Sequence, residues 1–146
     1  MNKYFLLLTL FFISIILAGC GGGLQAININ LKTDSDCNDN NAIVVKIYQL
    51  KNSDKFTHAS FESLLRDPEG TLTDDLIPNS KSEVTMVPGE SYEIKDLKII
   101  QGAQSIGIIG NFHSPAQDGW RQIIPLSSDI KNLKVSLHQN YLSVQK

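Results

Sequence analysis

Cys20 is the residue whose neighbours define the most specific chemistry in this chain. It ends the tetrapeptide Leu17-Ala18-Gly19-Cys20, which directly follows an apolar run over residues 4–18. Such a run enters the export machinery, and the small residues before Cys20 let a peptidase reach the bond that it cleaves. The Cys20 thiol then carries a diacylglycerol, and its freed amine is acylated. The pattern predicts a signal peptide over residues 1–19, which is removed, and a lipid on Cys20.

The alternative interpretation of this segment is a transmembrane helix with an incidental cysteine. The apolar run has about 15 residues, whereas a helix needs about 20 to cross the hydrocarbon core. Glycines at 21–23 favour a short flexible tether over residues 20–23 instead of a helix end. Several acyl chains give a stable anchor. Gly21 stands where an Asp would change the sorting of such lipoproteins, so we expect the outer membrane, with the domain facing the periplasm.

Composition predicts one ordinary domain over residues 24–146. The chain has 13 Lys and Arg and 15 Asp and Glu; without Lys3 the balance is 12 against 15, a formal charge of −3. No basic run is present, which argues against nucleic-acid binding. If Cys20 carries lipid, Cys37 has no partner within the chain. A free thiol or an intermolecular bridge follows, and we expect an unpaired surface thiol.

Alternating side chains predict short strands along most of the chain. Residues 26–32 place Ile27, Ile29 and Leu31 on one face, as in a half-buried strand. Further strands are predicted over residues 42–50, 82–87, 90–98, 105–112, 120–125, 131–138 and 141–144. Pro88-Gly89 fits the central pair of a type II turn, with Gly89 at positive φ. The fold class is therefore all-β, an antiparallel β-sandwich.

A helical insertion is expected after the second strand, over about residues 54–77. Phe61, Leu64 and Leu65 recur at helical spacing. Ser60 is suited to cap the first turn, and Pro68 limits how far the helix extends.

No constellation of catalytic or metal-binding residues is apparent. The acids and amides of residues 33–41 loosely resemble a calcium loop, but the positions that need Gly and Glu hold Asp39 and Val45. The three histidines are scattered, and neither a Ser-His-Asp order nor a nucleophile or phosphate motif is found. We expect no enzyme, no metal site and no cofactor apart from the covalent lipid.

Several segments in a fixed order carry a resemblance to a known family. They are Ile43-Val44-Val45-Lys46-Ile47-Tyr48-Gln49-Leu50-Lys51, Phe61-Glu62-Ser63-Leu64-Leu65, Asp75-Leu76, Met86-Val87-Pro88-Gly89-Glu90, Ser105-Ile106-Gly107-Ile108-Ile109-Gly110-Asn111-Phe112, Trp120-Arg121 and Pro125-Leu126. Together with the lipidation motif, this set resembles the TssJ (VasD, SciN) family of type VI secretion lipoproteins. The resemblance covers nearly the whole chain after Cys20. It implies a transthyretin-like β-sandwich with a small helical element.

The resemblance also implies a function. Members of the family are outer-membrane lipoproteins that bind the periplasmic C-terminal domain of TssM and, with TssL, form an envelope-spanning complex. Their contact element is the loop between the first two strands, which here, by position, comprises Thr33, Asp34, Ser35, Asp36, Cys37, Asn38, Asp39, Asn40 and Asn41.

The residues themselves are compatible with this role for the loop. It is polar enough that we expect it to stay out of the core, and its acids favour a basic surface on a partner. Two alternatives remain at this point. One is a solvated hairpin loop without a partner. The other is a periplasmic lipoprotein that binds a small ligand, or inhibits an enzyme, through the same loops.

Overall fold

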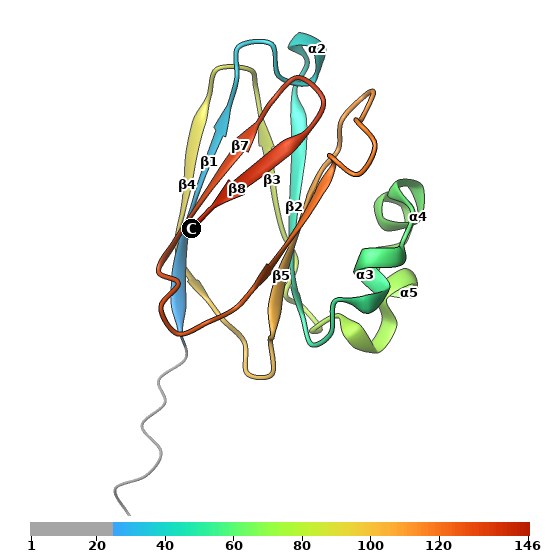
Figure 1. Ribbon diagram of the computed structural model, residues 1–146, viewed down its shortest axis with the longest axis vertical. Helices are drawn as coiled ribbons and strands as arrows, with labels where there is room; N and C mark the ends of the chain where they lie inside the picture. The colour runs from blue at the N-terminus through green and yellow to red at the C-terminus, as the bar shows by residue number, and fades with distance from the viewer. Residues whose placement is uncertain (1–24) are drawn as a thin grey trace, which may run out of the picture.

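A computed structural model describes residues 25–146, which form two facing four-stranded sheets (Figure 1). Sheet A has the strand order β4-β1-β7-β8, and sheet B has the order β3-β2-β5-β6. In chain order, the strands are β1 (Ala26–Thr33), β2 (Ile43–Leu50), β3 (Ser82–Met86), β4 (Ser91–Lys98), β5 (Ser105–Gly110), β6 (Arg121–Pro125), β7 (Asn132–Leu137) and β8 (Leu142–Gln145). The β-sandwich predicted from the alternating side chains is confirmed.

The pairing of the strands adds two features to that prediction. β1 pairs with β7 in parallel, whereas every other pair of named strands is antiparallel. β1 and β2 belong to different sheets, so the segment between them crosses the sandwich and is not a hairpin loop. The Pro88-Gly89 turn makes a similar crossing from β3 to β4. Gly89 has φ of 79°, and the Glu90 N–H donates to the Val87 carbonyl at 3.2 Å, as the predicted turn requires.

The core lies between the two sheets and is built by alternation along the strands. Ile27, Ile29 and Leu31 of β1 are buried, as their spacing predicts. They face the apolar side chains of β2 and β5, among them Val45 and Ile108, in one continuous cluster. On the opposite face of sheet A, polar side chains such as Lys32 of β1 and Lys134 of β7 are exposed. None of the described elements covers this face, which is common for antiparallel sheets.

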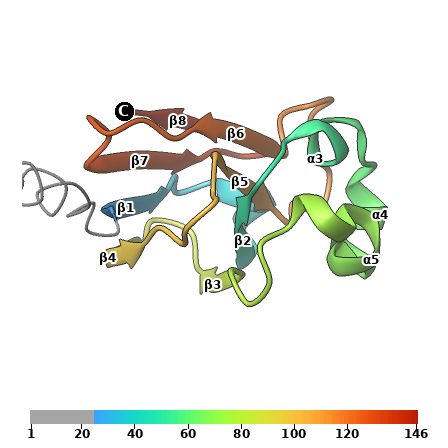
Figure 2. The ribbon, with the colours of Figure 1, turned by 90° about the horizontal axis from the view of Figure 1, so that it is seen from below.

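Helices cover the outer face of sheet B, as Figure 2 shows. They are α3 (Asp54–His58), α4 (Phe61–Arg66), α5 (Pro68–Leu72) and the 3₁₀ turn η1 (Thr73–Asp75), so the helical insertion follows β2 as expected. Ser60 caps α4 by accepting the Ser63 N–H at 3.1 Å. Phe56 of α3 and Leu64 of α4 are fully buried.

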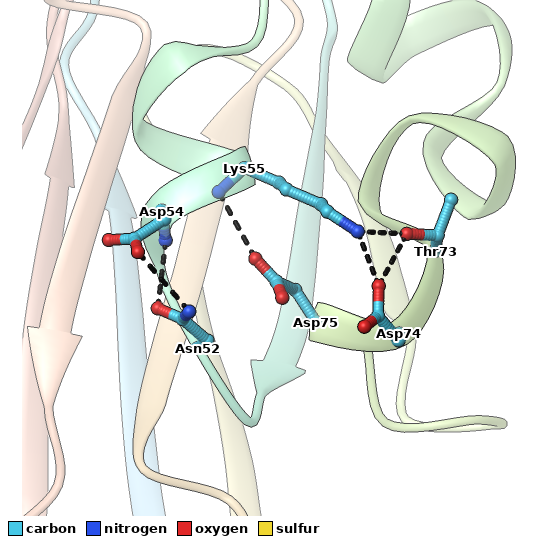
Figure 3. A network of polar contacts seen from close by, with 6 residues as sticks. All are labelled: Asn52, Asp54, Lys55, Thr73, Asp74 and Asp75. Atoms are coloured by element: carbon cyan, nitrogen blue, oxygen red, sulfur yellow. Dashed lines mark hydrogen bonds and ion pairs between the residues drawn. The ribbon is translucent and has the colours of Figure 1, made fainter.

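Polar contacts fix the start of α3 to η1 (Figure 3). The Asp75 carboxylate accepts the Lys55 N–H at 3.1 Å, and Lys55 Nζ contacts Thr73 Oγ1 and Asp74 Oδ1. Asn52 accepts the Asp54 N–H at 3.1 Å, which closes the turn into α3. Both ends of the insertion are thereby held together against sheet B.

A second set of contacts joins the insertion to β6. Arg121 donates from Nη1 to the carbonyls of Phe56 and Ala59, at 2.9 and 2.7 Å, near the end of α3. Its guanidinium lies 4.6 Å from the centre of the Trp120 ring, which in turn makes an edge contact with Phe61. Within residues 25–146, no helix is long and apolar enough to cross a membrane.

Candidate interaction site at the loop end

Four connections meet at the end of the sandwich opposite Gln25. We define this loop end as residues 34–42 between β1 and β2, 87–90 between β3 and β4, 111–120 between β5 and β6, and 138–141 between β7 and β8. β1 begins at the Gln25 end and finishes at the loop end (Figure 1). Cys20 and the signal peptide lie outside the described residues. The predicted contact loop therefore sits at the far end of the domain from its first described residue.

Consecutive left-handed residues give residues 37–40 their shape. Asn38, Asp39 and Asn40 have φ of 51°, 53° and 63° and form part of the short turn α2 (Cys37–Asn40). Asn and Asp tolerate this conformation better than other residues with a side chain. The run of Asn and Asp in the sequence is thus explained by backbone geometry.

Asn38 ties this turn to the neighbouring connection. Its Nδ2 donates to the Ala42 carbonyl at 2.7 Å, and its Oδ1 accepts the His113 N–H at 2.6 Å. Asn41 donates from Nδ2 to the carbonyls of Asn38 and Asp39 at 3.2 and 3.0 Å. A groove with a volume of about 520 Å³ lies beside these residues and is lined by Asn38, Asn41, Ala42, Asn111, Phe112 and His113.

Two expectations about the loop are wrong. We expected the loop to stay out of the core and Cys37 to be a surface thiol, yet Cys37 is fully buried and Asn38 is 5% exposed. Burial, followed by the nearby carboxylates of Asp34 and Asp36, raises the pKa of the Cys37 thiol to about 11. A lone Cys among polar neighbours carries no alternation signal, so its inward position was not predictable locally.

Thr33 is also buried and has a positioning role. Its Oγ1 donates to the Val87 carbonyl at 2.7 Å and accepts the Glu90 N–H at 2.8 Å. This joins the end of β1 to the turn between β3 and β4. Of the nine predicted contact residues, six expose their side chains wholly or in part: Asp34, Ser35, Asp36, Asp39, Asn40 and Asn41.

Asp34 and His138 join the loop to the turn between β7 and β8. His138 Nδ1 lies 2.7 Å from Asp34 Oδ2, Nε2 lies 3.0 Å from Ser143 Oγ, and the imidazole stacks on Tyr141 with 4.3 Å between ring centres. Sequence reasoning missed this set because Asp34 and His138 come from separate connections and are 104 positions apart. The order Asp-His-Ser occurs in hydrolases, which also need donors for an oxyanion. Here the contacts join the loop to the turn between β7 and β8 and to β8.

The loop end is acidic. Its four connections contain Asp34, Asp36, Asp39, Glu90 and Asp118, and none of them contains Lys or Arg. Gln139 donates from Nε2 to Asp39 at 2.9 Å, which holds that carboxylate in place. Within residues 25–146, no three His, Cys, Asp or Glu residues are arranged to hold a metal ion. Acidic side chains at a surface favour partners whose own surface is basic.

The two facing sheets and the helical insertion define an all-β sandwich. The sequence model of a family described as "Type VI secretion lipoprotein, VasD, EvfM, TssJ, VC_A0113" matches residues 25–140. The chain belongs to this family of type VI secretion lipoproteins. No curated protein matches the chain significantly.

Solved structures show the same fold. The lipoprotein TssJ1 of Pseudomonas aeruginosa is 19% identical, with a TM-score of 0.76 over 84% of this chain and 96% of that one. A chain of a structure described as "Type VI membrane complex" is 22% identical, with a TM-score of 0.73; the match covers 85% of this chain and 100% of that one. A chain of a structure described as the TssM C-terminal domain from EAEC is also 22% identical, with a TM-score of 0.68; the match covers 83% of this chain and 98% of that one.

Proposed function

We propose that this chain is a non-enzymatic scaffold that links the outer membrane to the type VI secretion membrane complex. A lipid on Cys20, after removal of residues 1–19, anchors it through the tether 20–23. The domain faces the periplasm and binds the periplasmic C-terminal domain of TssM, within a complex that also contains TssL. Family membership and the structures described as the membrane complex and the TssM domain support this assignment.

The binding part of the proposal is supported by the position of the loop between β1 and β2 and by its fixed conformation. It lies at the end of the domain away from Gln25, so an anchor that precedes this residue leaves the loop free to reach a partner (Figure 1). Asn38, Thr33 and the Asp34–His138 pair fix its conformation. A loop that is ordered before binding loses less conformational entropy when it binds.

The anchor is tested by replacing its cysteine. Cys20→Ser should leave the domain folded and release it from membranes into the soluble periplasmic fraction. Fractionation followed by immunoblotting measures this, and circular dichroism of the purified protein checks the fold. If the variant stays in the outer-membrane fraction, the anchor is not on Cys20.

The binding loop is tested with a matched pair of charge reversals. Ser35 and Asp36 form an exposed Ser-Asp pair at the loop end, and Ser128 and Asp129 form another at the opposite end. Changing Ser35 and Asp36 to Arg should weaken binding to the TssM periplasmic domain by about tenfold or more. Changing Ser128 and Asp129 to Arg makes the same change of charge and should leave affinity within about twofold. Calorimetry with the detergent-solubilised full-length protein measures both, and equal affinities for the two variants would place the contact elsewhere.

A further inference from the structure

Exposed apolar side chains on either side of the loop point to a larger contact surface. Within residues 25–146, the large hydrophobic side chains that are exposed are Val87 at 55%, Tyr92 at 48% and Tyr141 at 44%. Val87 and Tyr141 both belong to the loop end, one in the turn between β3 and β4 and the other in the turn between β7 and β8. Tyr92 lies in β4 and lines a groove with a volume of about 470 Å³ on sheet A.

Tyr141 is held in a fixed position. Its ring stacks on His138, which contacts Asp34 of the loop. Its Cβ packs against the backbone of Gly119, where an added Cβ atom would lie 2.6 Å away. The Leu142 N–H donates to the Gly119 carbonyl at 2.8 Å, and the His138 N–H donates to the Tyr141 carbonyl at 2.9 Å. A rigid, half-exposed tyrosine is the kind of residue that most often dominates the binding energy of an interface.

Val87 is held by contacts with the same loop. Its carbonyl accepts the Thr33 hydroxyl at 2.7 Å, and its N–H donates to the Glu90 carboxylate at 2.9 Å. The Gly89 N–H donates to the Asp34 carbonyl at 3.1 Å. The isopropyl group is therefore presented to solvent by a turn that the loop itself fixes.

Asp34 connects the two apolar residues. Its carbonyl accepts from the turn that carries Val87, and its carboxylate contacts the imidazole on which Tyr141 stacks. The loop, Val87 and Tyr141 thus form one surface. The Asp and Glu side chains of the loop end come from three of its four connections, and one of them, Asp118, pairs with Arg121 at 3.6 Å.

We propose that Tyr141 and Val87 are the apolar anchors of the partner contact, on either side of the loop. The surface they fit is an apolar depression bordered by Lys or Arg side chains on the periplasmic TssM domain; this inference rests on the proposed function. In this arrangement the two anchors supply most of the affinity, because apolar groups at a contact are removed from water. The carboxylates of the loop orient the partner and speed its approach.

The test compares single substitutions in the full-length protein, by calorimetry against the periplasmic TssM domain. Tyr141→Ala should weaken binding by about tenfold or more, and Val87→Ser by about threefold or more. Tyr92→Ala removes an equally exposed tyrosine outside the loop end and should leave affinity within about twofold. Tyr141→Phe keeps the ring on His138 and should bind nearly as well as the unchanged protein. Thermal unfolding of every variant checks that a loss of affinity does not come from a loss of the folded structure.

Salt dependence separates the two roles. Affinity of Tyr141→Ala should keep the salt dependence of the unchanged protein, whereas the Arg variants at Ser35 and Asp36 should alter it. If Tyr141→Ala and Val87→Ser both bind within twofold of the unchanged protein while those Arg variants lose affinity, the anchors are wrong and the proposed function stands. If none of these variants changes affinity, the loop end is not the contact, and both proposals fail.

Discussion

The ring of Phe56 lies on the backbone of Gly107. A Cβ atom added to this glycine would come within 2.6 Å of Phe56 Cε2 and 2.7 Å of Cζ. Phe56 belongs to α3 and Gly107 to β5, so this contact is where the helical insertion meets sheet B. Gly107 also pairs with Tyr48 of β2, whose ring makes an edge contact with Phe56. The glycine is needed here for close approach rather than for a turn.

We expect Gly107→Ala to lower the free energy of unfolding by about 1–3 kcal/mol, because the added methyl group overpacks the contact with Phe56. Chemical denaturation measures the change. Combining Gly107→Ala with Phe56→Ala should cost less than the sum of the two single changes, because the clash disappears with the ring. Additive costs in this double-mutant cycle would show that the glycine has another role.

Thr33→Val should destabilise the protein by about 1–3 kcal/mol, since the Val87 carbonyl loses the hydroxyl that donates to it and the Glu90 N–H keeps only its longer bond to that carbonyl, in a partly buried position. Thr85→Val makes the same chemical change at an exposed position of β3 and should alter stability by less than about 0.5 kcal/mol. Thermal unfolding compares the two variants. Equal costs would mean that the loss at Thr33 reflects its place in a strand and not its hydroxyl.

Cys37 should react with iodoacetamide only after the protein unfolds, because its side chain is fully buried and its pKa is raised to about 11. The folded pKa lies above the ordinary value of 9.0, so the thiol's contribution to stability is complete below pH 9 and is lost as the pH rises toward 11. Mass spectrometry of alkylated protein, with and without denaturant, measures the reaction. Cys37→Ala is the control, and rapid labelling of the folded protein at position 37 would contradict its buried position.

Lys55 and Asp74 give a contact with a defined pH dependence. The hydrogen bond from Lys55, followed by that from Thr73, lowers the pKa of Asp74 from its ordinary value of 3.8 to about 2. The stabilisation by this carboxylate is therefore present above pH 4 and is lost as the pH falls toward 2.

Lys55→Met should return the pKa of Asp74 toward 3.8, as measured by NMR titration of its carboxyl carbon. Lys81→Met removes a lysine that pairs with Glu83 instead and should leave the Asp74 titration unchanged. An unaltered pKa of Asp74 in Lys55→Met would show that the ion pair of Figure 3 is not formed in solution.

Local patterns predicted the elements of this fold well. Alternation along residues 26–32 identified the buried face of β1, and Ser60 marked the start of α4. The parallel pairing of β1 with β7 was not predictable, because alternation shows which face of a strand is buried but not which strand lies beside it. For the same reason, the sequence did not show that the loop between β1 and β2 crosses between the sheets, and a hairpin loop remained one alternative.

The candidate site was predictable only as a segment. The polar sequence of residues 33–41 identified a loop, and the resemblance gave it a role. The hydrogen bonds that order this loop are made to residues far along the chain. Thr33 bonds to Val87, Asn38 to His113, and Asp34 to His138. Such contacts exist only once the sheets are packed, so no local signal separates exposed members of the loop from buried ones.

The course of β1 has a consequence for how the domain bears force. The strand spans roughly 25 Å from the Gln25 end to the loop end, and it is hydrogen-bonded on both sides, to β4 and to β7. If the chain is anchored before Gln25 and bound at the loop end, as we propose, tension between these two points is directed along this strand. The ladders on both of its sides then carry the load in shear, so that many hydrogen bonds must break together before the strand moves. The domain should therefore extend little under load and yield, when it does, through a high unfolding barrier.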